Sequence, residues 1–178
     1  ALITAARNGK KVTAVVELLA RFDEESNIKW SKRMQEEGIN VIFGVEGLKI
    51  HSKLLYIESK KGNIACIGTG NFHEGNAKIY TDYLMMTARP KIVNEVAKVF
   101  DFIDRPFSPF RFNELLVSPN SMKSRILRML DTEIKNTNEG KEAWVKMKIN
   151  HITDTDMVAK LYQASKAGVK IDIVIRGN

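Results

Sequence analysis

A unit of helix, glycine and strand occurs near both ends of the chain, and it limits the possible folds more than any other feature. Residues 2–16 read LITAARNGKKVTAVV and residues 161–175 read LYQASKAGVKIDIVI, so a leucine, an alanine, a glycine and a lysine coincide in position. Each stretch predicts a helix that ends at its glycine, Gly9 or Gly168, and a buried strand after it. The repeat favours an α/β fold of two similar lobes, with a site assembled between them.

Helical and strand patterns alternate along the rest of the chain. A strand over residues 12–19, a helix over 26–37 and a strand over 39–43 form a βαβ unit, so these two strands should be parallel. The other predicted elements are a strand that holds His51, strands 64–68, 79–87, 115–117, 144–150 and 169–175, and helices 91–104, 122–135 and 155–166. Pro106 and Pro109 interrupt these patterns, so we place a domain boundary there, between 1–106 and 107–178.

The composition is that of a globular protein with an excess of positive charge. Lys and Arg exceed Asp and Glu by 28 to 21, which gives a net charge of +7 and favours a polyanionic partner. No run of about 18 apolar residues occurs and the start lacks the features of a signal peptide, so we expect a soluble, intracellular protein. The single cysteine, Cys66, lies in an apolar run and is predicted to be buried. Position 1 is not Met and both ends fall within predicted elements, so we expect a fragment.

Residues 48–71, LKIHSKLLYIESKKGNIACIGTGN, carry the clearest chemistry. His51 and Lys53 lie two positions apart, so in a strand their side chains leave the same face. The second apolar run leads into a glycine-rich loop that ends in Asn71. A neutral imidazole can attack phosphorus, while an ammonium group and N–H donors offset the charge of phosphoryl oxygens. The stretch therefore predicts a site that handles phosphate.

Other residues are explained by structure at least as well as by function. Lys148 and Asn150 share a face near a strand end and repeat the pairing of cation and amide, but a plain exposed edge explains them equally well. Trp30 has the spacing of a core residue on a predicted helix. His73 and His151 fall in predicted loops, where we expect them to be surface residues.

The segment around His51 resembles the histidine-lysine motif of the phospholipase D superfamily. A more specific resemblance is to the polyphosphate kinase family, and it rests on five motifs that follow in order along nearly the whole chain. These motifs are ARFDEE at 20–25, GLKIHSKL at 47–54, IGTGNF at 67–72, YTDY at 80–83 and VIRG at 174–177. The resemblance implies a phospholipase D-like sandwich of mixed sheets with flanking helices. Residues 1–106 would form a nearly complete first lobe, and residues 107–178 would begin a second.

The resemblance implies reversible transfer of phosphate between ATP and polyphosphate through a phosphohistidine. His51 would be the phosphorylated residue, with Lys53 and Asn71 in the same catalytic group. Arg21 would lie at the site of phosphate and of Mg²⁺, the implied cofactor. The residues implied to bind nucleotide or phosphate are Tyr80, Arg176, Lys148 and Asn150. The superfamily pattern has Asp seven residues after the histidine, where this chain has Glu58, and an odd offset places Glu58 on the opposite face of a strand.

The same resemblance implies ATP, ADP and polyphosphate as partners and the cytoplasm of a bacterium as location. Peripheral membrane association and homo-oligomerisation of the full-length enzyme are further expectations. A partner histidine from the second lobe would fall beyond residue 178, so we expect the isolated chain to be inactive. Two alternatives remain: a phospholipase D-type phosphodiesterase or nuclease, which uses water as acceptor, and a basic nucleic-acid-binding module. The core-like spacing of the aromatic residues disfavours the last one.

Overall fold

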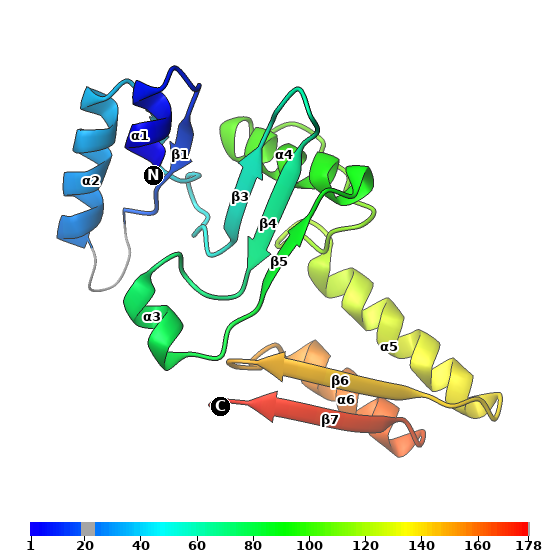
Figure 1. Cartoon of the computed structure of the whole chain (residues 1–178). Coiled ribbons are helices and arrows are strands. Elements are labelled where there is room, and N and C mark those ends of the chain that lie inside the picture. The colour runs from blue at the N-terminus through cyan, green and yellow to red at the C-terminus, as the bar shows by residue number, and fades with distance from the viewer. Residues whose placement is uncertain (19–23, 178) are drawn as a thin grey trace. The chain divides into compact units, whose positions relative to one another are not determined.

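A computed structural model describes residues 1–18 and 24–177 of the chain (Figure 1). The chain divides into two compact units, Ala1–Glu114 and Leu115–Asn178. Both units combine helices with small sheets, so the predicted α/β class is confirmed. No helix within the described residues is long and apolar enough to cross a membrane.

The first unit opens with two helices and a short parallel sheet. In chain order these elements are α1 (Leu2–Arg7), β1 (Thr13–Val15), α2 (Glu24–Glu36) and β2 (Asn40–Ile42). Strands β1 and β2 are parallel, which confirms the predicted βαβ unit. Ser31 is the buried residue of α2, and its hydroxyl donates to the Asn27 carbonyl (2.7 Å). The small side chain of Ser31 thus lies on the packed face of α2.

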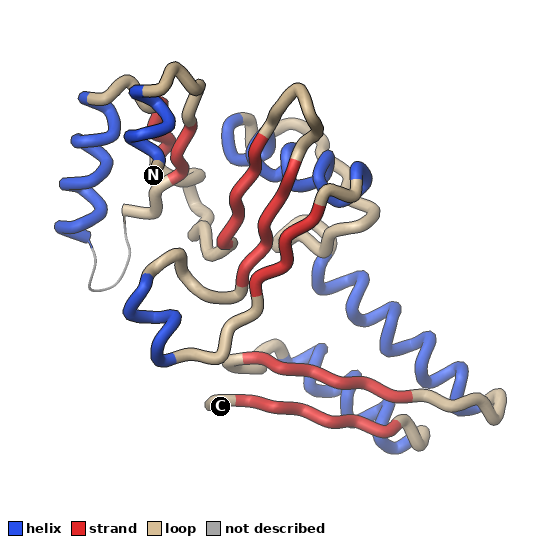
Figure 2. The backbone as a smooth tube through the Cα atoms, in the orientation of Figure 1, coloured by secondary structure: helices blue, strands red, loops and turns tan. Residues whose placement is uncertain are grey.

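An antiparallel sheet of three strands follows in the same unit (Figure 2). Its strands lie in the order β3 (Lys53–Ile57), β4 (Ile64–Gly68) and β5 (Leu84–Thr87). The short helix α3 (Glu74–Ile79) lies between β4 and β5 in the chain, and α4 (Pro90–Asp104) packs on β3 and β4. The buried apolar side chains of this sheet and helix are Ala65, Cys66, Val93, Val96, Val99 and Ile103. The predicted burial of Cys66 is confirmed.

The second unit contains two helices and a parallel pair of strands. Its elements are α5 (Met122–Asn138), β6 (Trp144–Ile149), α6 (Thr155–Lys166) and β7 (Lys170–Ile175). β6 and β7 run in the same direction (Figure 1). Along β6, Val145, Met147 and Ile149 are half-buried and the residues between them are exposed, as their alternation predicts. Ala143, Ala164 and Val169 form the buried core of this unit.

Two predicted strands begin later than expected. β3 begins at Lys53, so His51 lies in the segment before the strand and the argument from alternating faces does not apply to it. The second case is the strand predicted over residues 79–87. Its first residues belong to the end of helix α3, where the Tyr80 N–H donates to the Asn76 carbonyl (3.0 Å). Strand pairing there starts only at Leu84.

The predicted strand 115–117 is absent, because its carbonyl groups have other partners. The Leu115 carbonyl accepts a hydrogen bond from the Arg125 guanidinium (2.9 Å), and the Val117 carbonyl accepts from Ser121 N–H (2.8 Å). Just before it, both carboxylate oxygens of the buried Glu95 accept backbone N–H groups, those of residues 113 and 114 (2.6 and 3.0 Å). This segment is therefore fixed by side chains and a turn, without strand pairing.

Several aromatic residues do not lie where their spacing predicts. Trp30 is 56% exposed on α2, and Trp144, Tyr162 and Phe107 are also exposed. Core packing is therefore wrong for Trp30. The aromatic spacing no longer argues against a nucleic-acid-binding module.

Candidate active site

His51 is presented by a braced segment of backbone immediately before β3. The preceding N–H, that of Ile50, donates to the Glu17 carboxylate (3.0 Å). Glu17 follows β1, and its own carbonyl accepts from the Asn27 amide of α2 (2.9 Å). The histidine is itself exposed. The segment therefore holds an accessible imidazole on a backbone that Glu17 anchors at the preceding residue.

Positive charge surrounds the imidazole. The Lys53 ammonium lowers the pKa of His51, and partial burial and Lys49 lower it further. A lower pKa leaves a larger fraction of the imidazole neutral, and the neutral form is the nucleophile. The Lys53 ammonium also donates to the His51 carbonyl (2.5 Å), so the two residues are held together.

The sheet register places the glycine-rich loop beside Lys53. Gly68, the last residue of β4, pairs with Lys53 of β3 on one side and with Leu84 of β5 on the other. A β-carbon at Gly68 would lie 3.3 Å from the Leu84 side chain and 3.7 Å from Lys53 Cβ, so glycine avoids a tight contact. The loop to Asn71 starts directly after this residue. Glu58, in contrast, follows the opposite end of β3.

A depression of about 390 Å³ lies where this loop meets α3. Its lining brings together two of the predicted site residues, Asn71 and Tyr80, with Asp82 and Tyr83. His73 also lines it and caps α3, because its Nδ1 accepts the Asn76 N–H (3.4 Å). His51 and Lys53 are not part of this lining. The structure thus places His51 and Lys53 in one group, and Asn71 and Tyr80 in another, around one end of the three-stranded sheet.

In the second unit, the predicted residues gather where β6 and β7 end. Lys148 pairs with Val174, and the Gly177 N–H donates to the Asn150 carbonyl (3.1 Å), so Asn150 and Arg176 lie at the same edge. Carboxyl ends of parallel strands are the usual ligand edge of α/β sheets. The structure therefore joins Lys148, Asn150 and Arg176 into one polar strand edge.

The described residues do not form a metal site of their own. They contain no group of three or more His, Cys, Asp or Glu side chains that could hold a metal ion. Arg21 lies outside the described residues. Its guanidinium has only N–H donors, so it suits a phosphate and cannot be a metal ligand.

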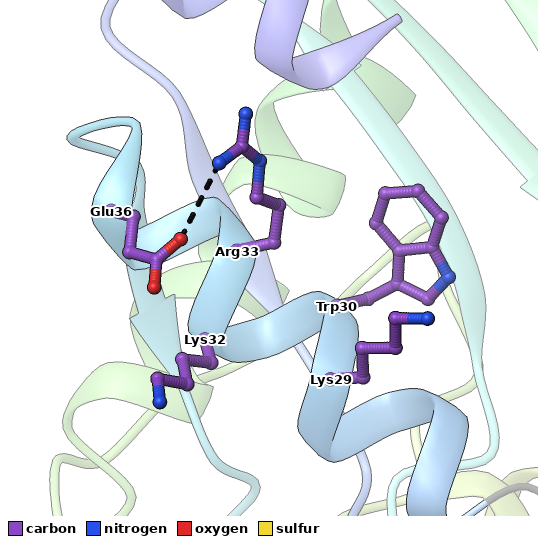
Figure 3. A pocket seen from close by; sticks show the side chains of 5 residues that line it. All are labelled: Lys29, Trp30, Lys32, Arg33 and Glu36. Carbon is purple, nitrogen blue, oxygen red and sulfur yellow. Dashed lines mark hydrogen bonds and ion pairs between the residues drawn. The ribbon is translucent and has the colours of Figure 1, made fainter.

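A second depression, of about 380 Å³, lies on the exposed face of α2 (Figure 3). Its lining residues are Lys29, Trp30, Lys32, Arg33 and Glu36. Arg33 pairs there with Glu36 (3.5 Å) and with Glu37 (2.7 Å), so part of the basic charge is neutralised. The lining of this second depression contains none of the predicted site residues, and we assign the depression no part in the chemistry.

Sequence reasoning missed three residues around His51 and the glycine-rich loop: Glu17, Thr69 and Asp82. Glu17 accepts the Ile50 N–H across 33 positions of the chain. The Thr69 hydroxyl donates to Asp82 (2.9 Å) across 13 positions. No local pattern signals such contacts, although Thr69 and Asp82 each lie within a motif that the sequence analysis quotes.

Comparison with known proteins places the whole chain in one group. Family models described as "Polyphosphate kinase C-terminal domain 1" and "Polyphosphate kinase C-terminal domain 2" match residues 1–109 and 115–178. The polyphosphate kinase of Vibrio parahaemolyticus is 53% identical over 99% of this chain and 26% of its own length. That of Escherichia coli K12 is 48% identical over the same shares. The chain thus spans about a quarter of the length of these relatives.

A solved structure confirms the fold. Polyphosphate kinase from Porphyromonas gingivalis matches with a TM-score of 0.83 and 39% sequence identity, over 98% of this chain and 30% of that chain. The predicted phospholipase D-like α/β fold is therefore confirmed. The predicted roles of individual residues and the assignment of two catalytic lobes stay predictions.

Proposed function

The chain belongs to the polyphosphate kinase family, and we propose that it carries the phosphoryl-transfer step between ATP and polyphosphate, with His51 as the phosphorylated residue. The observation that supports this most is the pairing of an accessible His51 with Lys53 on a backbone braced by Glu17. The pKa of His51 is lowered by Lys53, which favours the neutral nucleophile.

The first step is attack of an imidazole nitrogen of His51 on the terminal phosphorus of ATP. A nitrogen–phosphorus bond forms, the bond from phosphorus to the bridging oxygen breaks, and ADP leaves with that oxygen. In the second step a terminal oxygen of polyphosphate attacks the same phosphorus and releases His51. The Lys53 ammonium offsets charge on the phosphoryl oxygens in both steps, and the amide of Asn71 is proposed to donate to them.

Nucleotide and polyphosphate are proposed to contact the remaining predicted residues. Tyr80 lines the depression beside Asn71, which suits a base or ribose contact. Arg176, Lys148 and Asn150 lie at one strand edge, which suits phosphate. Arg21 is proposed as a further phosphate contact. Mg²⁺ is the proposed metal, and when bound to ATP it would neutralise phosphate charge.

The proposal extends to the setting of the enzyme. The relatives described above come from bacteria, and ATP is an intracellular nucleotide, which favours the cytoplasm. Peripheral membrane association and homo-oligomerisation are proposed for an enzyme of the relatives' full length on the family resemblance alone. Sedimentation of that enzyme with and without lipid vesicles measures both.

The three histidines of the chain allow a matched test of the chemistry. An enzyme of the relatives' full length that carries this sequence should incorporate acid-labile phosphate from ATP, and peptide mapping should place that phosphate on His51. His51→Ala should abolish the incorporation, while His73→Ala and His151→Ala should retain it. Phosphate on either of the other histidines would contradict the assignment. Release of free phosphate from ATP without any labelled protein would instead support a hydrolase of the phospholipase D type.

A further inference from the structure

Asp82 makes contacts that hold the glycine-rich loop of the first unit in one conformation. Its Oδ1 accepts a hydrogen bond from the Thr69 hydroxyl (2.9 Å). The same hydroxyl accepts the Tyr83 N–H (2.9 Å), and the Thr69 N–H donates to the Tyr83 carbonyl (3.0 Å). Thr69 is thus tied at three points to the segment before β5.

The other carboxylate oxygen of Asp82 lies over Gly70. A β-carbon at Gly70 would overlap the Asp82 carboxylate and lie 3.0 Å from its Cβ. The backbone of Gly70 is therefore closely covered by this side chain, and only glycine leaves room for it. One carboxyl group thereby fixes two successive residues of the loop that leads to Asn71.

Asp82 also acts on the cation next to the nucleophile. Partial burial lowers the pKa of Lys53, and the negative charge of Asp82 opposes this and raises it. Lys53 in turn lowers the pKa of His51, in the segment before β3, and so does Lys49. Glu17 lies beside them, bonded to the Ile50 N–H. The Asp82 carboxylate therefore favours the charged form of Lys53.

We propose that Asp82 is a positioning residue of the phosphoryl-transfer site: it holds the Thr69–Gly70 backbone so that Asn71 faces the reacting phosphate. This inference rests on the proposed function, because it assigns Asp82 a part in the phosphorylation of His51. The carboxylate itself touches neither phosphate nor imidazole in this role. Its effect passes through the loop and through Lys53.

The Asp82→Asn variant separates the effect of the negative charge of Asp82 from the effect of its hydrogen bond with Thr69. The amide oxygen still accepts the Thr69 hydroxyl, but the negative charge is lost, so the pKa of Lys53 falls. Lys53 then loses its proton at lower pH, and the alkaline limb of the rate–pH profile for His51 phosphorylation moves to lower pH. The experiment measures this profile and the thermal unfolding midpoint in an enzyme of the relatives' full length. An unmoved limb in a variant with an unchanged midpoint overturns the effect of Asp82 on Lys53.

A second pair of variants tests the contact while the charge stays. Thr69→Val keeps the shape but removes the hydroxyl, and we expect it to slow phosphorylation by about 10²-fold, the cost of a misplaced reacting group. Thr69→Ser keeps the hydroxyl and should stay near the unsubstituted rate. Equal rates for Thr69→Val and Thr69→Ser overturn the proposal, even where Asp82→Asn fails to fold. Absence of phosphate on His51 in the unsubstituted enzyme would instead contradict the proposed function.

Discussion

The units of helix, glycine and strand in residues 2–16 and 161–175 have the same pattern of backbone hydrogen bonds at the glycine. They differ in the side chains beyond the ends of their strands. At each glycine the N–H donates to the carbonyl three residues earlier (2.9 Å at Gly9, 3.0 Å at Gly168). The next N–H donates to the carbonyl five residues before it (3.0 and 3.1 Å). Both glycines have a positive φ, 73° and 96°. The sequence repeat is therefore a repeat of helix termination.

The difference lies in two aligned residues beyond the strands, Glu17 and Arg176. After β1, Glu17 accepts the N–H of Ile50, next to the proposed nucleophile. The aligned position after β7 is Arg176, whose guanidinium has N–H donors and no acceptor. A carboxylate can brace backbone N–H groups there, and a guanidinium can bind phosphate. In our proposal one local fold therefore supports two tasks, bracing of the backbone at Glu17 and binding of phosphate at Arg176.

Each unit carries a lysine at the end of its sheet where the predicted site residues lie: Lys53 in the first unit and Lys148 in the second. Replacing each lysine by an uncharged residue should give the largest difference in rate between the two units. Lys53→Met is expected to slow phosphorylation of His51 by about 10²–10³-fold, the usual cost of a lost preorganised donor. Because Lys53 lowers the pKa of His51, its loss raises that pKa. The imidazole is then protonated at higher pH, so the acid limb of the rate–pH profile moves to higher pH. Lys148→Met should leave the acid limb in place.

Phosphate incorporation from ATP over a series of pH values checks this contrast. Lys53→Arg is the matched control, because it keeps the charge and should keep the acid limb near its original position. Equal shifts from Lys53→Met and Lys148→Met would break the comparison, since both edges would then act on the same imidazole.

A smaller difference, in the kinetic constants for ATP, is expected between substitutions of Arg176 and of Glu17. Arg176→Ala removes charge-assisted hydrogen bonds worth about 1.5–3 kcal/mol, so kcat/KM for ATP should fall by about 10–10²-fold. Arg176→Lys should recover only part of this, because lysine cannot donate in a bidentate manner. Glu17→Gln keeps an oxygen for the Ile50 N–H and should leave the KM for ATP near its original value. Steady-state kinetics that give the same loss of ATP binding at both positions would remove the proposed division of tasks.

Elements with strong local signals were predictable from the sequence. α6 begins and ends at the predicted residues 155 and 166. Asp154 caps its start, because its Oδ1 accepts the Met157 N–H (3.0 Å), and Gly168 follows its end. The alternating burial of β6 follows directly from its alternating side chains. The motif around His51 also predicted that His51 and Lys53 lie together, and the hydrogen bond between them agrees with this. Their roles and that of Asn71 stay predictions.

Long-range contacts explain what the sequence did not reveal. The strand expected at 115–117 is absent because Arg125 takes the Leu115 carbonyl, and a guanidinium ten residues away leaves no local pattern. Asp82 reaches the loop at Thr69 only after the chain has passed through α3. The exposure of Trp30 depends on which face of α2 is packed, and periodicity alone did not identify that face.

The smallest contrast concerns the two glycines themselves. Alanine at either position must adopt a positive φ, which costs about 1–2 kcal/mol in the free energy of unfolding. At Gly9 an added β-carbon meets nothing within 4 Å, whereas at Gly168 it would lie 3.2 Å from the Thr137 methyl carbon. Gly168→Ala should therefore destabilise its unit more than Gly9→Ala destabilises the other.

The contribution of the Thr137 contact can be isolated by a double-mutant cycle. Thr137→Ser removes the methyl group, so Gly168→Ala in that background should lose about 0.5 kcal/mol or more of its extra cost. The two tryptophans lie one in each unit, at Trp30 and Trp144, so Trp144→Phe and Trp30→Phe variants let urea titrations followed by fluorescence report on each unit separately. If positions 137 and 168 show no coupling, the larger cost of Gly168→Ala comes from the backbone, because φ is 96° at Gly168 and 73° at Gly9. The repeat would then differ in its turn geometry as well as in the residue that follows its strand.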